Sequence, residues 1–159
     1  MNHFSVSLQR LRPSAVLPAY ASEEAAGMDL FAALEEPVTL LPGTRTRIPC
    51  GFAMAPERND VAGLIFARSG LAHKLGLAPS NAVGVVDADY RGEVMVSLAN
   101  SGSEPYTLRP GERFAQLVFV PVLRADLREI GEGETLNPTE RGSGGFGSTG
   151  SFSPEQAST

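Results

Sequence analysis

Short apolar runs broken by glycine and proline extend along this chain, and they restrict its possible folds more than any other feature. The 159 residues include 17 Gly and 12 Pro. Runs rich in β-branched residues and bounded by turn residues are typical of β-strands. We therefore expect an all-β fold, with strands within residues 4–11, 38–48, 51–54, 61–67, 83–86, 93–99 and 113–120.

Composition and charge exclude several functional classes. The length fits one domain with a real core, and a net charge of -5 argues against non-specific binding to nucleic acid. We find no apolar run long enough to cross a membrane and no pattern of a secretory signal. Cys50 is the single cysteine and cannot form an intrachain disulfide, which fits the cytoplasm.

Residues 68–76 are the best candidate for a helix, with Ser69 as its N-cap and Gly76 as its terminator. A helix start formed by Arg68, Ser69 and Gly70 can bind an anion, because free backbone N–H groups lie beside a guanidinium. The alternative is a capped surface helix whose arginine forms a salt bridge.

Residues 81–93 carry the densest set of reactive groups. An apolar run at residues 83–86 ends at Asp87, Asp89 and Tyr90, and a second alternating run follows. This pattern predicts a β-hairpin with acids and an aromatic ring at its bend. A carboxylate there can activate water, and a tyrosine ring can stack on a sugar. The alternative is a polar surface turn.

Two polar residues interrupt apolar segments. Asp29 follows a run of small residues, so it needs an arginine partner or a nearby metal ion. Gln116 lies in the predicted strand at residues 113–120, and either another strand or a ligand must satisfy its amide.

The C-terminal region lacks strand periodicity. Residues 124–140 are acidic and loop-like, and residues 141–150 contain five glycines around Arg141 and Phe146. Glycines allow backbone amides to approach phosphates closely, although a flexible tail is the alternative. We expect a β-domain at residues 1–123, an arm at 124–150 and a polar tail at 151–159.

Together, five stretches resemble the motifs of the trimeric dUTP diphosphatase (dUTPase) family, in the family's order. They occupy residues 26–32, 68–71, 81–93, 111–116 and 141–150. The resemblance implies a jelly-roll β-barrel with one short helix and a flexible Gly-rich C-terminal arm. It also implies a homotrimer in which each site takes the first, second and fourth motifs from one subunit, residues 81–93 from a second and the arm from a third.

The resemblance further implies hydrolysis of dUTP to dUMP and diphosphate, which limits uracil in DNA and supplies dUMP for thymidylate synthesis. Asp87 is then the catalytic base, and Asp29 holds Mg²⁺ through water or only pairs with Arg68. The implied substrate-binding residues are Arg68, Ser69, Gly70, Asn81, Val85, Val86, Tyr90, Met95, Gln116, Arg141, Phe146, Gly147, Ser148 and Thr149. The alternatives are a dCTP deaminase-like enzyme and a jelly-roll module that binds a nucleotide without catalysis.

Overall fold

A computed structural model describes residues 3–145. Within this range the chain forms β-strands and one short helix, which confirms the predicted all-β class. The elements are β1 (Val6–Arg10), β2 (Ala19–Tyr20), β3 (Met28–Phe31), β4 (Val38–Leu40), β5 (Arg45–Pro49), β6 (Phe52–Pro56), β7 (Val61–Ala67), α1 (Ser69–Leu75), β8 (Leu77–Pro79), β9 (Gly84–Val86), β10 (Met95–Asn100), β11 (Tyr106–Leu108) and β12 (Arg113–Pro121).

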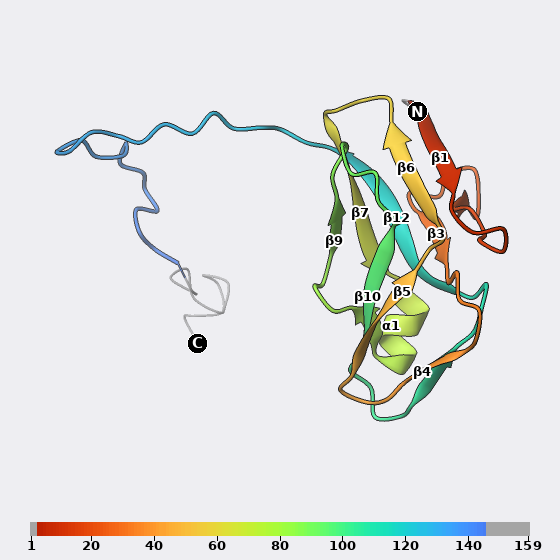
Figure 1. Cartoon of the computed structure of the whole chain (residues 1–159). Helices are drawn as coiled ribbons and strands as arrows, with labels where there is room; N and C mark the ends of the chain where they lie inside the picture. Colours follow the sequence, from red (N-terminus) through yellow and green to blue (C-terminus); the bar gives the residue numbers. More distant parts are fainter. Residues whose placement is uncertain (1–2, 146–159) are drawn as a thin grey trace. The chain divides into compact units, whose positions relative to one another are not determined.

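The strands form small antiparallel sheets (Figure 1). The largest has the order β2-β3-β12-β7-β9, and a second has the order β5-β10-β8. Two further pairs, β1 with β6 and β11 with β4, complete the set among residues 3–145. Most neighbours are distant in sequence, so long-range pairing rather than local hairpins holds the fold together.

The core forms where one face of each sheet is apolar. In β10, Val96 and Leu98 are buried while Met95, Ser97 and Ala99 are more exposed, as the two-residue period of a strand requires. Phe52 and Phe114 are the largest fully buried side chains and belong to the same core cluster. Asn100 is the polar exception among the described residues, and it bonds to the carbonyl oxygens of Leu40 and Glu104 at 3.0 and 2.8 Å.

The predicted helix is present, but its predicted N-cap is wrong. Ser69 is the first residue of α1, while Arg68 occupies the N-cap position with extended φ and ψ of -81° and 128° and makes no side-chain cap bond. The terminator is confirmed. Gly76 has a φ of 68°, and its N–H donates to the carbonyl of Ala72. This left-handed backbone conformation favours glycine, because glycine has no Cβ to cause a steric clash.

The predicted hairpin between the runs at residues 83–86 and 93–99 is wrong. β9 pairs with β7, whereas the next strand, β10, pairs with β5 and β8 in a different sheet. The apolar run at residues 83–86 is also not buried along its whole length. Val85 is 63% exposed, and Val86 is the buried member of β9. Residues 87–94 therefore form a connection between two sheets.

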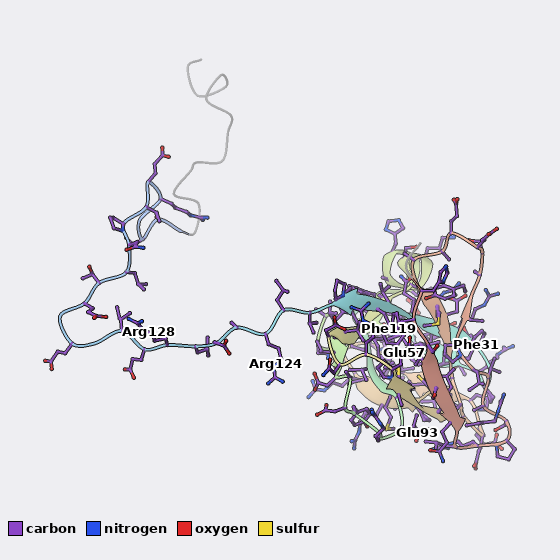
Figure 2. All side chains as sticks on the ribbon, turned by 90° about the horizontal axis from the view of Figure 1, so that it is seen from above. Phe31, Glu57, Glu93, Phe119, Arg124 and Arg128 are labelled. Atoms are coloured by element: carbon purple, nitrogen blue, oxygen red, sulfur yellow. The ribbon has the colours of Figure 1, made fainter. Side chains whose placement is uncertain are left out.

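After β12 the chain has no helix or strand as far as residue 145. The described chain divides into two units, with the boundary between residues 123 and 124, and the side chains of Arg124 and Arg128 belong to the second (Figure 2). Among the described residues, no helix has the length and apolar character needed to cross a membrane. The predicted roles of Phe146, Gly147, Ser148 and Thr149 concern residues outside the described range.

Candidate active site

Asp29 connects two arginines at one end of the largest sheet. It lies on β3, and its side chain is 13% exposed. One carboxylate oxygen is 3.0 Å from Nε of Arg68, and the other is 3.1 Å from Nη1 of Arg113. Arg68 Nη1 also donates to the carbonyl of Arg113 at 3.3 Å. One negative and two positive side chains leave this cluster with a net positive charge, which favours an anionic ligand.

Gln116 lies beside this cluster on β12, opposite Asp29 of β3 and Phe66 of β7. Its Nε2 donates to the carbonyl of Ala67 at 2.8 Å, so a neighbouring strand satisfies the amide N–H. Its Oε1 lies next to Gly27, where an added Cβ would approach to 3.0 Å. Gly27 thus leaves the room that the Gln116 side chain occupies.

The connection after β9 places Asp87 and Tyr90 at the surface. The N–H of Tyr90 donates to the carbonyl of Asp87 at 3.1 Å, which closes a turn. The guanidinium of Arg91 donates to the carbonyls of Ala88 and Tyr90, at 2.8 and 3.0 Å. Asp87 is exposed, and Tyr90 is 45% exposed. The turn therefore presents a carboxylate and an aromatic ring to solvent on a hydrogen-bonded frame.

Glu93 anchors the end of this connection (Figure 2). One oxygen accepts from the N–H of Gly51 at 3.0 Å, and the other lies 3.3 Å from Nη2 of Arg12. Its side chain is 19% exposed. Burial, and secondarily the nearby Glu93 carboxylate, raise the pKa of the Cys50 thiol to about 12. Cys50 therefore stays protonated near neutral pH and is not a nucleophile there.

Strand register places Asp87 far from Arg68 within one chain. Val86 lies opposite Gly63 in the antiparallel pair β7–β9. Arg68 follows Gly63 by five positions along β7. Asp87 follows Val86 by one position, and because the strands are antiparallel this step leads in the opposite direction. Because Arg68 itself has extended backbone, these six positions put the Cα atoms of Asp87 and Arg68 roughly 20 Å apart, at about 3.3 Å per residue. The backbones of Asp87 and Arg68 therefore lie beyond opposite ends of the β7–β9 pair.

An apolar groove of about 210 Å³ lies elsewhere, over strands β1, β2, β3, β6 and β12. Its lining residues are Phe4, Val6, Leu8, Pro18, Tyr20, Met28, Met54, Leu117 and Phe119. It includes none of the predicted substrate-binding residues, so this groove is not the candidate active site.

The family model described as dUTPase matches residues 14–150 of this chain, which is most of its length. The chain belongs to the dUTPase family. Curated relatives named deoxyuridine 5'-triphosphate nucleotidohydrolase agree. The protein from Alcanivorax borkumensis is 47% identical, with 89% of this chain and 92% of that protein covered. The protein from Desulfitobacterium hafniense strain DCB-2 is 46% identical, with 94% and 99% covered.

Solved dUTPase structures share the fold. The Staphylococcus bacteriophage 80alpha dUTPase with dUPNHPP has a TM-score of 0.82 and 27% identity, covering 92% of this chain and 99% of that one. A mutant dUTPase from phage phi11 of S. aureus, described with a structural Mg(II) ion, has a TM-score of 0.72 and 25% identity, covering 82% and 99%. This chain therefore has the predicted jelly-roll fold of the dUTPases.

The predicted site residues of this dUTPase fall into separate groups. Arg68, Ser69, Gly70 and Gln116 gather near Asp29, while Asn81, Val85, Val86, Asp87, Tyr90 and Met95 lie along the β9–β10 region. Arg141 is exposed on the second unit, and its Nε donates to the carbonyl of Gly144 at 3.0 Å.

Arg113, Gly92 and Glu93 carry no individual role predicted from the sequence, although all three contact residues of these groups. Arg113 had a usable signal, since it is a charged residue at the start of a buried strand that contains Gln116.

Proposed function

We propose that this dUTPase family member hydrolyses dUTP to dUMP and diphosphate. The observation that carries the proposal is the match to deoxyuridine 5'-triphosphate nucleotidohydrolases over nearly the whole chain. A fold relative described with dUPNHPP supports a nucleotide triphosphate as the substrate class. In a cytoplasmic setting, this activity would limit uracil in DNA and supply dUMP for thymidylate synthesis.

Asp87 is the proposed general base. Its exposed carboxylate takes a proton from water as the water oxygen bonds to the α-phosphorus of dUTP. The bond from this phosphorus to the oxygen bridging it to the β-phosphorus breaks, and diphosphate leaves with that oxygen. A positioned general base of this kind contributes about 10²–10⁴-fold in rate.

The arginine cluster is the proposed phosphate site. Arg68, Ser69, Gly70 and Gln116 would contact the triphosphate, with Asp29 fixing the guanidinium of Arg68. Both oxygens of Asp29 already accept from arginines, so this carboxylate fits a Mg²⁺ ion held through water better than one bound directly. The ion would neutralise charge on the phosphate oxygens.

Base and sugar selection is assigned to the β9–β10 region. Asn81, Val85, Val86 and Met95 would surround the uracil, and the Tyr90 ring would lie against the deoxyribose. Asn81 has both a donor and an acceptor for the uracil edge. The arm would supply Arg141 to the γ-phosphate, Phe146 to the base, and Gly147, Ser148 and Thr149 to the remaining contacts.

The active site is proposed to be shared within a homotrimer. Its support is the roughly 20 Å between Asp87 and Arg68 along paired strands of one chain. A second copy that brings its residues 81–93 to the arginine cluster would supply the missing half of the site. Residues 1–123 would form the β-domain, residues 124–150 the arm that reaches a neighbour, and residues 151–159 a polar tail. The stretch from Pro121 to Arg141 would reach roughly 65–70 Å if fully extended, at about 3.3–3.6 Å per residue.

A nucleotide panel tests the function. The purified protein is incubated with dUTP, dCTP, dTTP or UTP, with Mg²⁺ or with a chelator, and dUMP, diphosphate and ammonia are measured. We expect dUMP and diphosphate in equal amounts from dUTP, at a much higher rate with Mg²⁺. Ammonia from dCTP would indicate a deaminase instead, and tight dUTP binding without any product would indicate a binding module.

A further inference from the structure

Gly92 has no room for a side chain, and the obstacle is the ring of Tyr90. A Cβ added to Gly92 would lie 2.6 Å from Cζ and 3.0 Å from Cε2 of Tyr90, with the hydroxyl closer still. Carbon atoms in normal contact are about 3.5–4.0 Å apart. The backbone of Gly92 is not in the left-handed region, so space rather than φ requires glycine here.

The Tyr90 ring is also fixed at its far end. Its hydroxyl donates to the carbonyl of Glu93 at 3.0 Å. The Glu93 side chain in turn accepts from the N–H of Gly51 and lies beside Arg12. Because Gly51 lies between β5 and β6, the first of these contacts holds Glu93 against the β5–β6 connection. The ring therefore lies against Gly92, while Tyr90 as a whole is 45% exposed.

We propose that Gly92 is a positioning residue that sets the depth of the Tyr90 ring, and through it the discrimination between deoxyribose and ribose. This inference rests on the proposed function, in which the ring lies against the sugar. A methyl group at position 92 would push the ring outward by about 1 Å to reach normal contact. The displaced ring would no longer keep the close fit against the deoxyribose that excludes a 2′-hydroxyl.

The test is a double-mutant cycle between Gly92→Ala and Tyr90→Ala, with kcat/KM measured for dUTP and UTP. A misplacement of this size costs about 10- to 100-fold, so Gly92→Ala should narrow the dUTP/UTP ratio by that factor. Tyr90→Ala should narrow the ratio similarly, and adding Gly92→Ala to it should change the ratio no further. Ser103→Ala is the control, because Ser103 is exposed and belongs to neither group of proposed site residues.

Three results would overturn the role of Gly92. The first is an unchanged dUTP/UTP ratio of kcat/KM in Gly92→Ala. The second is a double variant in which the two reductions of this ratio multiply. The third is a crystal structure of Gly92→Ala with the Tyr90 ring in its original position. If Gly92→Ala does not fold, removing the ring should restore folding in the double variant, and failure to do so also rejects the proposal. Absence of dUTP hydrolysis in the wild type would instead reject the proposed function, while the crystal structure still tests the ring position.

Discussion

Asp87 and Arg68 lie roughly 20 Å apart along the paired strands β7 and β9 of one chain. The antiparallel register causes this separation, because the two residues extend beyond opposite ends of the pairing. This separation supports the proposal that the water-activating carboxylate and the phosphate-binding guanidinium of one site come from two copies of the chain.

Replacing the proposed base should abolish turnover without abolishing binding. In Asp87→Asn we expect kcat to fall by about 10²–10⁴-fold, because the amide cannot accept the proton from water, while dUTP still binds. Stopped-flow or steady-state diphosphate release measures the rate, and calorimetry measures binding. Asp89→Asn is the control, since Asp89 is an equally exposed acid two residues away. A folded Asp87→Asn protein with near-normal kcat would show that another group activates the water.

Removing the acid between the arginines should weaken the phosphate site. Asp29→Asn takes away the charge that holds Arg68 and Arg113 together, so we expect a raised KM for dUTP and a lower kcat/KM. The control is Asp60→Asn, which breaks the exposed Arg58–Asp60 pair and should leave both constants unchanged. Equal effects of the two substitutions would argue against a specific role for Asp29.

Cys50 should give a pH dependence of stability on the alkaline side. The pKa of its thiol rises from its ordinary value of 9.0 to about 12 in the folded protein, mainly through burial. The unfolded chain therefore loses this proton first, and the free energy of unfolding falls as pH rises from 9 towards 12. The slope is at most about 1.4 kcal/mol per pH unit.

Urea denaturation of the wild type and Cys50→Ala at pH 8 and pH 10 measures this effect, since other titrating groups are common to both proteins. From pH 8 to pH 10, we expect the free energy of unfolding to fall more in the wild type than in Cys50→Ala. A constant difference over this range would contradict the assigned pKa.

Truncation should separate the β-domain from the arm. A chain ending at Glu140 lacks residues 141–150, and we expect it to keep its melting temperature but to lose most of its turnover. The physical reason is the proposed role of the arm, which would supply contacts to the bound nucleotide and exclude water from it. A chain ending at Gly150 is the matched control and should be fully active. Full activity of the shorter chain would remove the arm from the mechanism.

Local signals in the sequence predicted the elements well. Turn residues bound β7, and its predicted range of 61–67 equals the observed one. The left-handed terminator at Gly76 was likewise predictable, because glycine adopts positive φ without a steric cost. Ser69 was placed wrongly at the N-cap because residue preference was used, whereas the backbone turns into the helix one residue earlier, at Arg68.

Long-range pairing was not predictable in the same way. Adjacent runs in sequence suggested that β9 and β10 form a hairpin, but each finds its partner in a distant strand. The need of Asp29 for a cation was clear from its apolar surroundings, and its ion pair with Arg68 is present. Its second partner, Arg113, depends on the register of β12 against β3 and on an irregularity between Arg113 and Ala115.

Subunit complementation tests the shared site most directly. Arg68→Ala and Asp87→Asn proteins are mixed, subunit exchange is confirmed by native mass spectrometry, and dUMP formation is compared with that of each variant alone. If a site takes Arg68 from one copy and Asp87 from another, random mixing should restore about one quarter of the wild-type activity. Activity that stays at the level of the separate variants after confirmed exchange would contradict the shared site.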